Sequence, residues 1–164
     1  NDAAVAIAEY ISGDVDSFAA LMNQEAAAMG ATRSHFVNPN GLPDENHYTC
    51  VYDMYLIFSN AIKNDTFVSI IGTTSYDVTY TDASGEAVTH TWENTNQYLT
   101  GNATTPDGFQ IVGGKTGTTG EAGYCLVLYS YNPSGQPIIS IVFKADGKSN
   151  LYLLMNEMLQ GFAI

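Results

Sequence analysis

One stretch of the sequence decides between fold classes: Gly113-Gly114-Lys115-Thr116-Gly117-Thr118-Thr119, which lies between a short predicted strand and a longer one. Its Gly-Lys-Thr core also occurs in phosphate loops, which have the pattern Gly-x-x-x-x-Gly-Lys-Thr and lead into a helix. Here the first glycine of that pattern would have to be residue 109, which is Phe109, and the residues that follow, 120–123, lead into a strand. A phosphate loop is therefore disfavoured on both counts.

Strand-like patterns surround this stretch. Residues 75–81 and 86–92 alternate around the turn Asp82-Ala83-Ser84-Gly85 and predict a hairpin. A polar loop, 93–108, follows the hairpin. Further strands are predicted at 109–112, 124–131 and 137–145, with the turn Asn132-Pro133-Ser134-Gly135 between the last two.

Helical periodicity dominates the rest of the chain. We expect the first helix to be capped by Asn1 or Asp2, the second to end at Gly30 and the third to be capped by Thr49. The predicted helices cover residues 3–11, 14–29, 49–62, 65–71 and 149–159. This order predicts an α/β (α+β) domain in which helices flank an antiparallel sheet, with a helical part at 1–72 and a sheet with a C-terminal helix at 73–164.

The charge balance limits the partners of the chain. It has 5 Lys and Arg residues against 17 Asp and Glu residues, a formal net charge of −12. So few basic residues cannot form a basic patch, which disfavours nucleic acid and anionic membranes as partners. No apolar run approaches the ~18 residues of a membrane helix. The low proportion of charged residues, 13%, favours an extracytoplasmic protein.

The cysteines and histidines predict no metal site. Cys50 and Cys125 permit one disulfide at most, and we favour buried free thiols over a bridge while leaving both open. The spacing of His35, His47 and His90 matches no metal-binding motif, so we expect these side chains to make hydrogen bonds in loops or with solvent.

The Asn94-Thr95-Asn96 segment beside Trp92, the single tryptophan, has two interpretations. It could line a cleft, or its side chains could cap local turns. The sequence leaves this choice open.

The other interpretation of the Gly113–Thr119 stretch is the Lys-Thr-Gly element of penicillin-binding proteins and serine β-lactamases. The whole chain resembles the C-terminal part of the serine-type D-alanyl-D-alanine carboxypeptidases, the low-molecular-weight penicillin-binding proteins. The matching segments occur in the order of the family: Asn1-Asp2-Ala3-Ala4-Val5-Ala6, Leu21-Met22-Asn23, His35-Phe36-Val37-Asn38-Pro39-Asn40-Gly41-Leu42, Tyr52-Asp53-Met54, Gly114-Lys115-Thr116-Gly117-Thr118 and Ala122-Gly123-Tyr124. The resemblance implies a β-lactamase-like catalytic domain that uses no cofactor.

The chain departs from the family pattern in one respect. The family uses Ser-x-x-Lys, Ser-x-Asn and Lys-Thr-Gly, and only the last is complete here. The positions three residues before the four lysines hold Asn60, Val112, Ile141 and Ala145, none of which is serine. Asn1 matches the asparagine of Ser-x-Asn. We therefore expect the second half of a catalytic domain, with the N-terminal part missing and no activity by itself.

The resemblance also assigns roles. It implies an enzyme that removes the terminal D-Ala from peptidoglycan stem peptides through an acyl-enzyme, and that β-lactams acylate. Lys115 and Thr116 would bind the terminal carboxylate, Gly117 would let the substrate backbone lie against the strand, and the Thr118 N–H would form part of the oxyanion hole. Asn1 would hold the substrate amide. The alternative is a non-catalytic module of the same fold that binds peptidoglycan or a partner chain.

The strand predicted at 137–145 leads us to expect that the chain pairs with another segment. In the resembled fold the sheet has five strands, and those at one side come from the N-terminal part. Residues 138–143 are apolar on both faces, and an uncovered strand edge of that composition promotes aggregation. We therefore expect this edge to pair with the missing N-terminal half or with a second copy of the chain.

Overall fold

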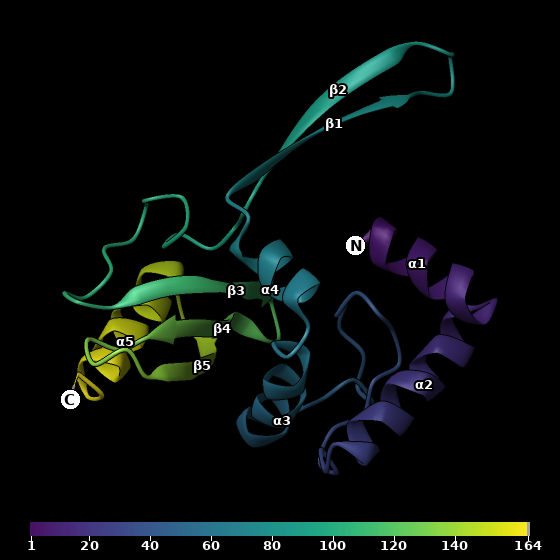
Figure 1. Ribbon diagram of the computed structural model, residues 1–164. Coiled ribbons are helices and arrows are strands. Elements are labelled where there is room, and N and C mark those ends of the chain that lie inside the picture. The colour runs from purple at the N-terminus through teal and green to yellow at the C-terminus, as the bar shows by residue number, and fades with distance from the viewer. Residues whose placement is uncertain (164) are drawn as a thin grey trace.

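A computed structural model describes residues 1–163 and arranges them as helices, then strands, then a helix (Figure 1). The helices α1 (Asp2–Ser12), α2 (Val15–Ala28), α3 (Val51–Ala61) and α4 (Asp65–Gly72) come first. They precede β1 (Ser75–Thr81), β2 (Ala87–Glu93), β3 (Gln110–Thr119), β4 (Gly123–Tyr131), β5 (Pro137–Ala145) and α5 (Lys148–Gln160). This order and the antiparallel pairing of the strands confirm the predicted α/β (α+β) class.

Local capping explains where the first two helices begin and end. Asn1 is the N-cap of α1, and its backbone carbonyl accepts a 3.0 Å hydrogen bond from the Ala4 N–H. The Asp14 carboxylate accepts one of 2.7 Å from the Ser17 N–H at the start of α2. Gly30 has φ +85° and ends α2, as predicted from the conformational freedom of glycine.

The cap predicted for α3 was wrong by one residue. Cys50, not Thr49, is the N-cap, and its side chain makes no capping hydrogen bond. The Thr49 hydroxyl instead bonds to the Ser34 hydroxyl at 2.7 Å. A tertiary contact with the preceding loop therefore replaces the local cap.

The central sheet is antiparallel, with the order β3-β4-β5, so β3 and β5 form its edges. The predicted short strand at 109–112 was incomplete, because β3 continues through the glycines to Thr119 with a bulge between Ile111 and Gly113. The Lys115–Thr118 segment therefore lies within a strand, as the resemblance implied, and this strand is at an edge of the sheet.

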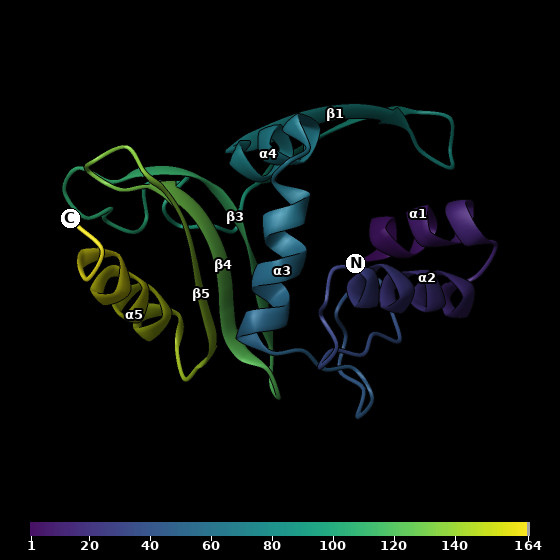
Figure 2. The same cartoon turned by 60° about the horizontal axis from the view of Figure 1, so that its bottom comes forward.

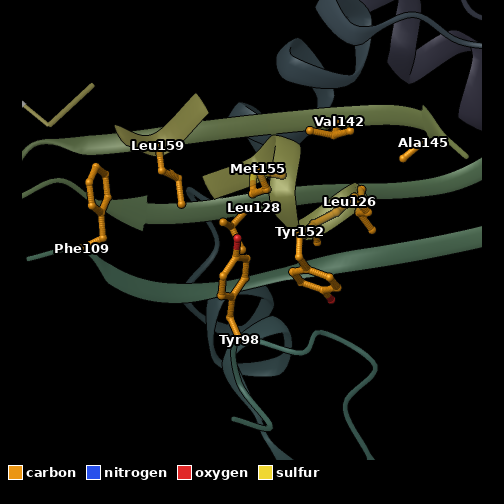
Figure 3. Close-up of a cluster of buried hydrophobic side chains, with 10 residues drawn as sticks. Tyr98, Phe109, Leu126, Leu128, Val142, Ala145, Tyr152, Met155 and Leu159 are labelled. Carbon is orange, nitrogen blue, oxygen red and sulfur yellow. The ribbon is translucent and has the colours of Figure 1, made fainter. Parts of the chain in front are cut away.

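Helices cover both faces of this sheet (Figure 2). Leu126 and Leu128 of β4 pack with α5 in the larger core, whereas Val127 packs on the other face with Phe58 of α3 and Ile71 of α4. Figure 3 shows the larger core, whose labelled members are Tyr98, Phe109, Leu126, Leu128, Val142, Ala145, Tyr152, Met155 and Leu159. Each buried side chain of the size of leucine contributes about 1.5–3 kcal/mol, so this core holds α5 on the sheet.

The remaining elements lie outside these layers. In both views, α3 and α4 lie between the sheet and the α1–α2 pair (Figures 1 and 2). The antiparallel pair β1–β2 forms a separate two-stranded hairpin that projects from the end of α4 (Figure 1). The Asp82 carboxylate orders its turn by accepting hydrogen bonds from the N–H groups of Ser84 and Glu86.

Asp53 joins the loop after α2 to α3. Its side chain is 1% exposed and accepts hydrogen bonds from the Arg33 N–H at 2.7 Å and the Ser34 hydroxyl at 2.8 Å. Burial by itself would raise the pKa of this carboxyl, but these hydrogen bonds outweigh it, so the pKa lies below its ordinary value. Asp53 therefore remains ionised and holds this loop at the start of α3.

Two of the three histidines make the loop hydrogen bonds that we predicted. A ring nitrogen of His35, Nδ1, lies 2.6 Å from the Asn46 carbonyl oxygen, and His47 Nδ1 accepts a 3.1 Å hydrogen bond from the Val37 N–H. Burial lowers the pKa of His47, which favours this neutral, accepting form.

Both cysteines are free thiols, as favoured from the sequence, although they are half-buried rather than buried. Within residues 1–163, no cluster of three or more His, Cys, Asp or Glu side chains could hold a metal ion. None of the helices in that range has both the length and the apolar character to cross a membrane.

Candidate active site

The Lys115–Thr118 segment presents its side chains from the outer edge of the sheet. Lys115, Gly117 and Thr118 are exposed, and Thr116 is half-buried. A Cβ added to Gly117 would meet nothing within 4 Å. The surface at Gly117 is therefore open, and an extended peptide can approach the strand closely at this position.

Lys115 provides the positive charge of this edge. Its Nζ donates a hydrogen bond to the backbone carbonyl of Thr116. The ammonium group therefore lies beside the strand edge, where it can attract a carboxylate in a chain whose net charge is otherwise strongly negative.

A second segment reaches the site from the loop after β2. The hydroxyl groups of Thr95 and Thr116 share a hydrogen bond. Since a hydroxyl donates one hydrogen bond and accepts others, Thr95 can set the direction in which the Thr116 hydroxyl donates. The sequence suggested that the Asn94-Thr95-Asn96 segment could line a cleft, but not that it contacts Thr116.

The same segment also caps local turns, as the second interpretation of it predicted. Asn94 donates from Nδ2 to the Thr73 carbonyl at 2.8 Å, and its Oδ1 accepts from the Asn96 N–H at 2.9 Å. Asn96 is fully buried, and its Oδ1 accepts a 3.2 Å hydrogen bond from the Tyr98 N–H. The asparagines thus hold the backbone on both sides of Thr95.

Helix α5 anchors this loop from the other side. The Tyr152 hydroxyl accepts a 2.8 Å hydrogen bond from the Gln97 N–H, and the Tyr98 hydroxyl donates to Asn156 Oδ1 at 2.7 Å. The two tyrosine rings meet edge to face with centroids 5.1 Å apart. Burial raises the pKa of Tyr98 well above its ordinary value, so this hydroxyl stays protonated as a donor.

The two glycines before Lys115 allow close packing of β3. A Cβ on Gly113 would overlap the Ile71 carbonyl at the end of α4, and a Cβ on Gly114 would overlap the Val127 carbonyl of β4. These glycines, which superficially resemble part of a phosphate loop, are therefore required by contacts with neighbouring backbone.

Substituting Gly114→Ala should destabilise the fold, because the added methyl group has no space beside the Val127 carbonyl. We expect the free energy of unfolding to fall by about 1–3 kcal/mol, the usual cost of overpacking. Urea denaturation followed by circular dichroism measures this change. Gly117→Ala is the matched control on the same strand, and it should stay within about 0.5 kcal/mol of the parent. Equal stability of all three proteins would contradict this account of the glycines.

Asn1, the remaining predicted site residue, lies at the start of α1 in the helical part. Its side chain is exposed and makes no capping hydrogen bond, so its amide is available to a ligand. Figures 1 and 2 place this end of α1 with the α1–α2 pair, on the other side of α3 and α4 from the sheet. The structure thus brings Lys115, Thr116, Gly117 and Thr118 together on β3 and places Asn1 on a different element.

Comparison with known proteins gives a consistent match. The family model described as peptidase S11, D-alanyl-D-alanine carboxypeptidase, matches residues 1–147. The D-alanyl-D-alanine carboxypeptidase DacF of Bacillus subtilis is 34% identical over 160 residues, which cover 97% of this chain and 38% of that protein. A D-alanyl-D-alanine carboxypeptidase of a Streptomyces species is 32% identical over 174 residues, covering 99% of this chain and 56% of that protein.

Solved structures agree with these relatives. A mutant of a Streptomyces DD-transpeptidase superposes with a TM-score of 0.87 at 30% identity, over 99% of this chain and 63% of that one. The D-alanyl-D-alanine carboxypeptidase DacD of Francisella tularensis superposes with a TM-score of 0.81 at 26% identity, over 98% of this chain and 48% of that one. The chain therefore spans 38–56% of the length of the two curated relatives and about half to two thirds of these structures.

Proposed function

This chain belongs to the D-alanyl-D-alanine carboxypeptidase family, and we propose that it supplies the substrate-binding half of such an enzyme. The enzyme would remove the terminal D-Ala from peptidoglycan stem peptides. The observation that carries the proposal is the exposed edge of β3, where Lys115, Thr116, Gly117 and Thr118 follow one another beside the ordered Thr95 loop.

The proposed reaction has two steps. A serine hydroxyl from a Ser-x-x-Lys element attacks the carbonyl between the two D-alanines, an ester forms, and the terminal D-Ala leaves with the proton on its amine. Water then attacks the ester, which releases the shortened peptide and restores the serine hydroxyl. A β-lactam would undergo the same first step: the serine hydroxyl attacks the carbonyl of its ring, and the ring opens to leave a stable ester.

The residues of this chain would bind and polarise the substrate. The Lys115 ammonium group would attract the terminal carboxylate, and the Thr116 hydroxyl, oriented by Thr95, would donate a hydrogen bond to it. The Thr118 N–H would stabilise the oxyanion that develops during attack. Open space at Gly117 would admit the peptide backbone, and Asn1 would bind the substrate amide from the helical side.

The test is a completed domain, by which we mean this chain preceded by a segment that carries Ser-x-x-Lys. We expect it to release D-alanine from an N-acylated peptide that ends in D-Ala-D-Ala and to retain a fluorescent penicillin covalently. Replacement of the serine by alanine should abolish both signals. Binding of the peptide without release of D-alanine would instead favour a non-catalytic binding module.

The outer edge of β5 is part of this proposal. Among residues 1–163, β5 pairs with β4 only, and its central residues Ile138, Ile139, Ile141 and Phe143 are all half-buried. An apolar edge with free backbone groups is a template for further pairing. We propose that a strand from a preceding segment, or a second copy of this chain, pairs with residues 138–143.

Light scattering of the 164-residue chain tests the pairing. We expect dimers or larger species that increase with concentration, because the backbone donors and acceptors of β5 need partners. The completed domain should be monomeric if its preceding segment supplies the strand. A chain that stays monomeric and monodisperse across the concentration series would refute edge pairing.

The working location of such an enzyme would be outside the cytoplasm, in the bacterial cell envelope or secreted. The composition supports this proposal, because only 13% of the residues are charged and few are lysine. A signal from the completed domain in the extracytoplasmic fraction of a bacterial host would test it.

A further inference from the structure

The loop between β2 and β3, residues 94–109, is tied to α5 at two points by one side chain, that of Asn156. Its Oδ1 accepts the 2.7 Å hydrogen bond from the Tyr98 hydroxyl, and its Nδ2 donates to the Thr104 carbonyl at 3.2 Å. An amide side chain can accept and donate at once, which an apolar side chain of similar size cannot. Asn156 therefore holds both limbs of the loop against the helix.

A buried part of the same loop lies behind the exposed Thr95. Asn96 and Tyr98 are 0% and 8% exposed, and Figure 3 shows the Tyr98 ring within the larger core. On the other side of Thr95, the Asn94 N–H donates to the Thr74 carbonyl at 2.8 Å. The position of the Thr95 hydroxyl thus depends on contacts of its neighbours, which water cannot easily replace because they are largely buried.

The Thr95 hydroxyl shares its hydrogen bond with the Thr116 hydroxyl, and either of the two can be the donor. Each hydroxyl has one proton, so a Thr116 that donates to Thr95 has none left for a ligand. If Thr95 donates instead, the Thr116 proton is free to point at a ligand. A carboxylate that accepts from Thr116 favours this second arrangement, in which the two hydroxyls form a chain and polarise each other.

A charged acceptor gains more from such a chain than a neutral one, because a hydrogen bond to an ionised group is about twice as strong. We infer that Tyr98 and Asn156 are positioning residues for the Thr116 hydroxyl and raise the preference of the site for a free C-terminal carboxylate over a C-terminal amide. They act through Thr95, since Tyr98 is buried and Asn156 belongs to α5. The binding of the terminal carboxylate by Thr116 comes from the proposed function, on which this assignment rests.

Tyr98→Phe is the sharpest variant, because it removes a single oxygen atom. It keeps the ring and its edge-to-face contact with Tyr152, with centroids 5.1 Å apart, and removes only the hydrogen bond to Asn156. Tyr131→Phe is the matched control, since it removes a tyrosine hydroxyl that bonds to Tyr129 at 3.2 Å and leaves the Tyr98–Asn156 bond intact.

The completed domain with its serine replaced by alanine reports binding without turnover. NMR titration with an N-acylated peptide that ends in D-Ala-D-Ala, and with its C-terminal amide, gives the ratio of the two Kd values. We expect Tyr98→Phe to lower the preference for the acid about threefold to tenfold, with the affinity for the amide nearly unchanged. Asn156→Leu and Thr95→Val should lower it in the same direction, Thr95→Ser should restore it, and Tyr131→Phe should leave it unchanged.

A double-mutant cycle tells positioning from a general loss of stability. If Tyr98 acts through Thr95, the double variant Tyr98→Phe/Thr95→Val lowers the preference no further than Thr95→Val by itself. Additive effects of the two substitutions would overturn the inference. So would an equal loss of affinity for the acid and the amide in Tyr98→Phe, or an unchanged preference.

Release of D-alanine by the completed domain with its serine in place is measured separately. The expected preferences in a domain that releases no D-alanine keep the positioning role and refute the carboxypeptidase function. Release of D-alanine together with an unchanged preference in Tyr98→Phe keeps the function and overturns the positioning role. A parent domain that binds the acid and the amide equally overturns the positioning role in either case, because Thr116 then distinguishes no carboxylate.

Discussion

A polypeptide of these 164 residues should form no covalent adduct with benzylpenicillin and should release no D-alanine from a D-Ala-D-Ala peptide. Acylation needs a serine whose hydroxyl loses its proton to a nearby base, and none of the four lysines here has a serine three residues before it. Without that nucleophile, only noncovalent binding at Lys115–Thr118 remains. Intact-mass spectrometry after incubation with penicillin measures the result.

The control for this expectation is the completed domain under the same conditions, whose mass should increase by that of one penicillin molecule. The difference between the two samples is all or none, so it does not depend on a small change in rate. A stoichiometric adduct on the 164-residue chain by itself would mean that the assignment of its motifs is wrong.

Lys115→Ala in the completed domain should lower the rate of penicillin acylation at least about tenfold and up to about a hundredfold. A charge-assisted hydrogen bond to a carboxylate is worth about 1.5–3 kcal/mol, and each 1.36 kcal/mol changes a rate tenfold. Lys115 is exposed at the strand edge and close to the Thr116 carbonyl, so its removal leaves the packing of the sheet unchanged. Stopped-flow or gel measurements with a fluorescent penicillin give the rate.

Lys148→Ala is the matched control, since it removes the same charge from an exposed position at the first turn of α5. It should leave acylation unchanged, whereas a general effect of net charge would slow both variants alike. Acylation of Lys115→Ala at the parent rate would remove Lys115 from the proposed carboxylate site.

Much of the fold was predictable from local sequence. The strands 75–81 and 137–145 begin and end at the predicted residues, and Gly30 marks the end of α2 as its cap preference indicated. Asp14, predicted as the first residue of that helix, is its N-cap. These features depend on side chains within a few residues of each other, so the sequence contains all the information that they need.

The course of β3 required the tertiary structure. Glycines in a row predict a loop, yet Gly113 and Gly114 lie within a strand because the backbones of α4 and β4 approach too closely for a Cβ. The predicted cap at Thr49 failed for a similar reason, since Ser34, fifteen residues earlier in the chain, binds its hydroxyl. Contacts between segments that are distant in the sequence override local preferences at both places.

The candidate site, like the fold, was predictable from the sequence only in part. The sequence by itself determined the Lys115–Thr118 element, because those residues are consecutive and their chemistry is local to one strand. Only the tertiary structure decided that Thr95 meets Thr116 and that Tyr152 and Asn156 of α5 hold the loop in between. The physical reason is that each of these contacts joins different elements, whose relative positions follow from how α4 and α5 pack on the sheet.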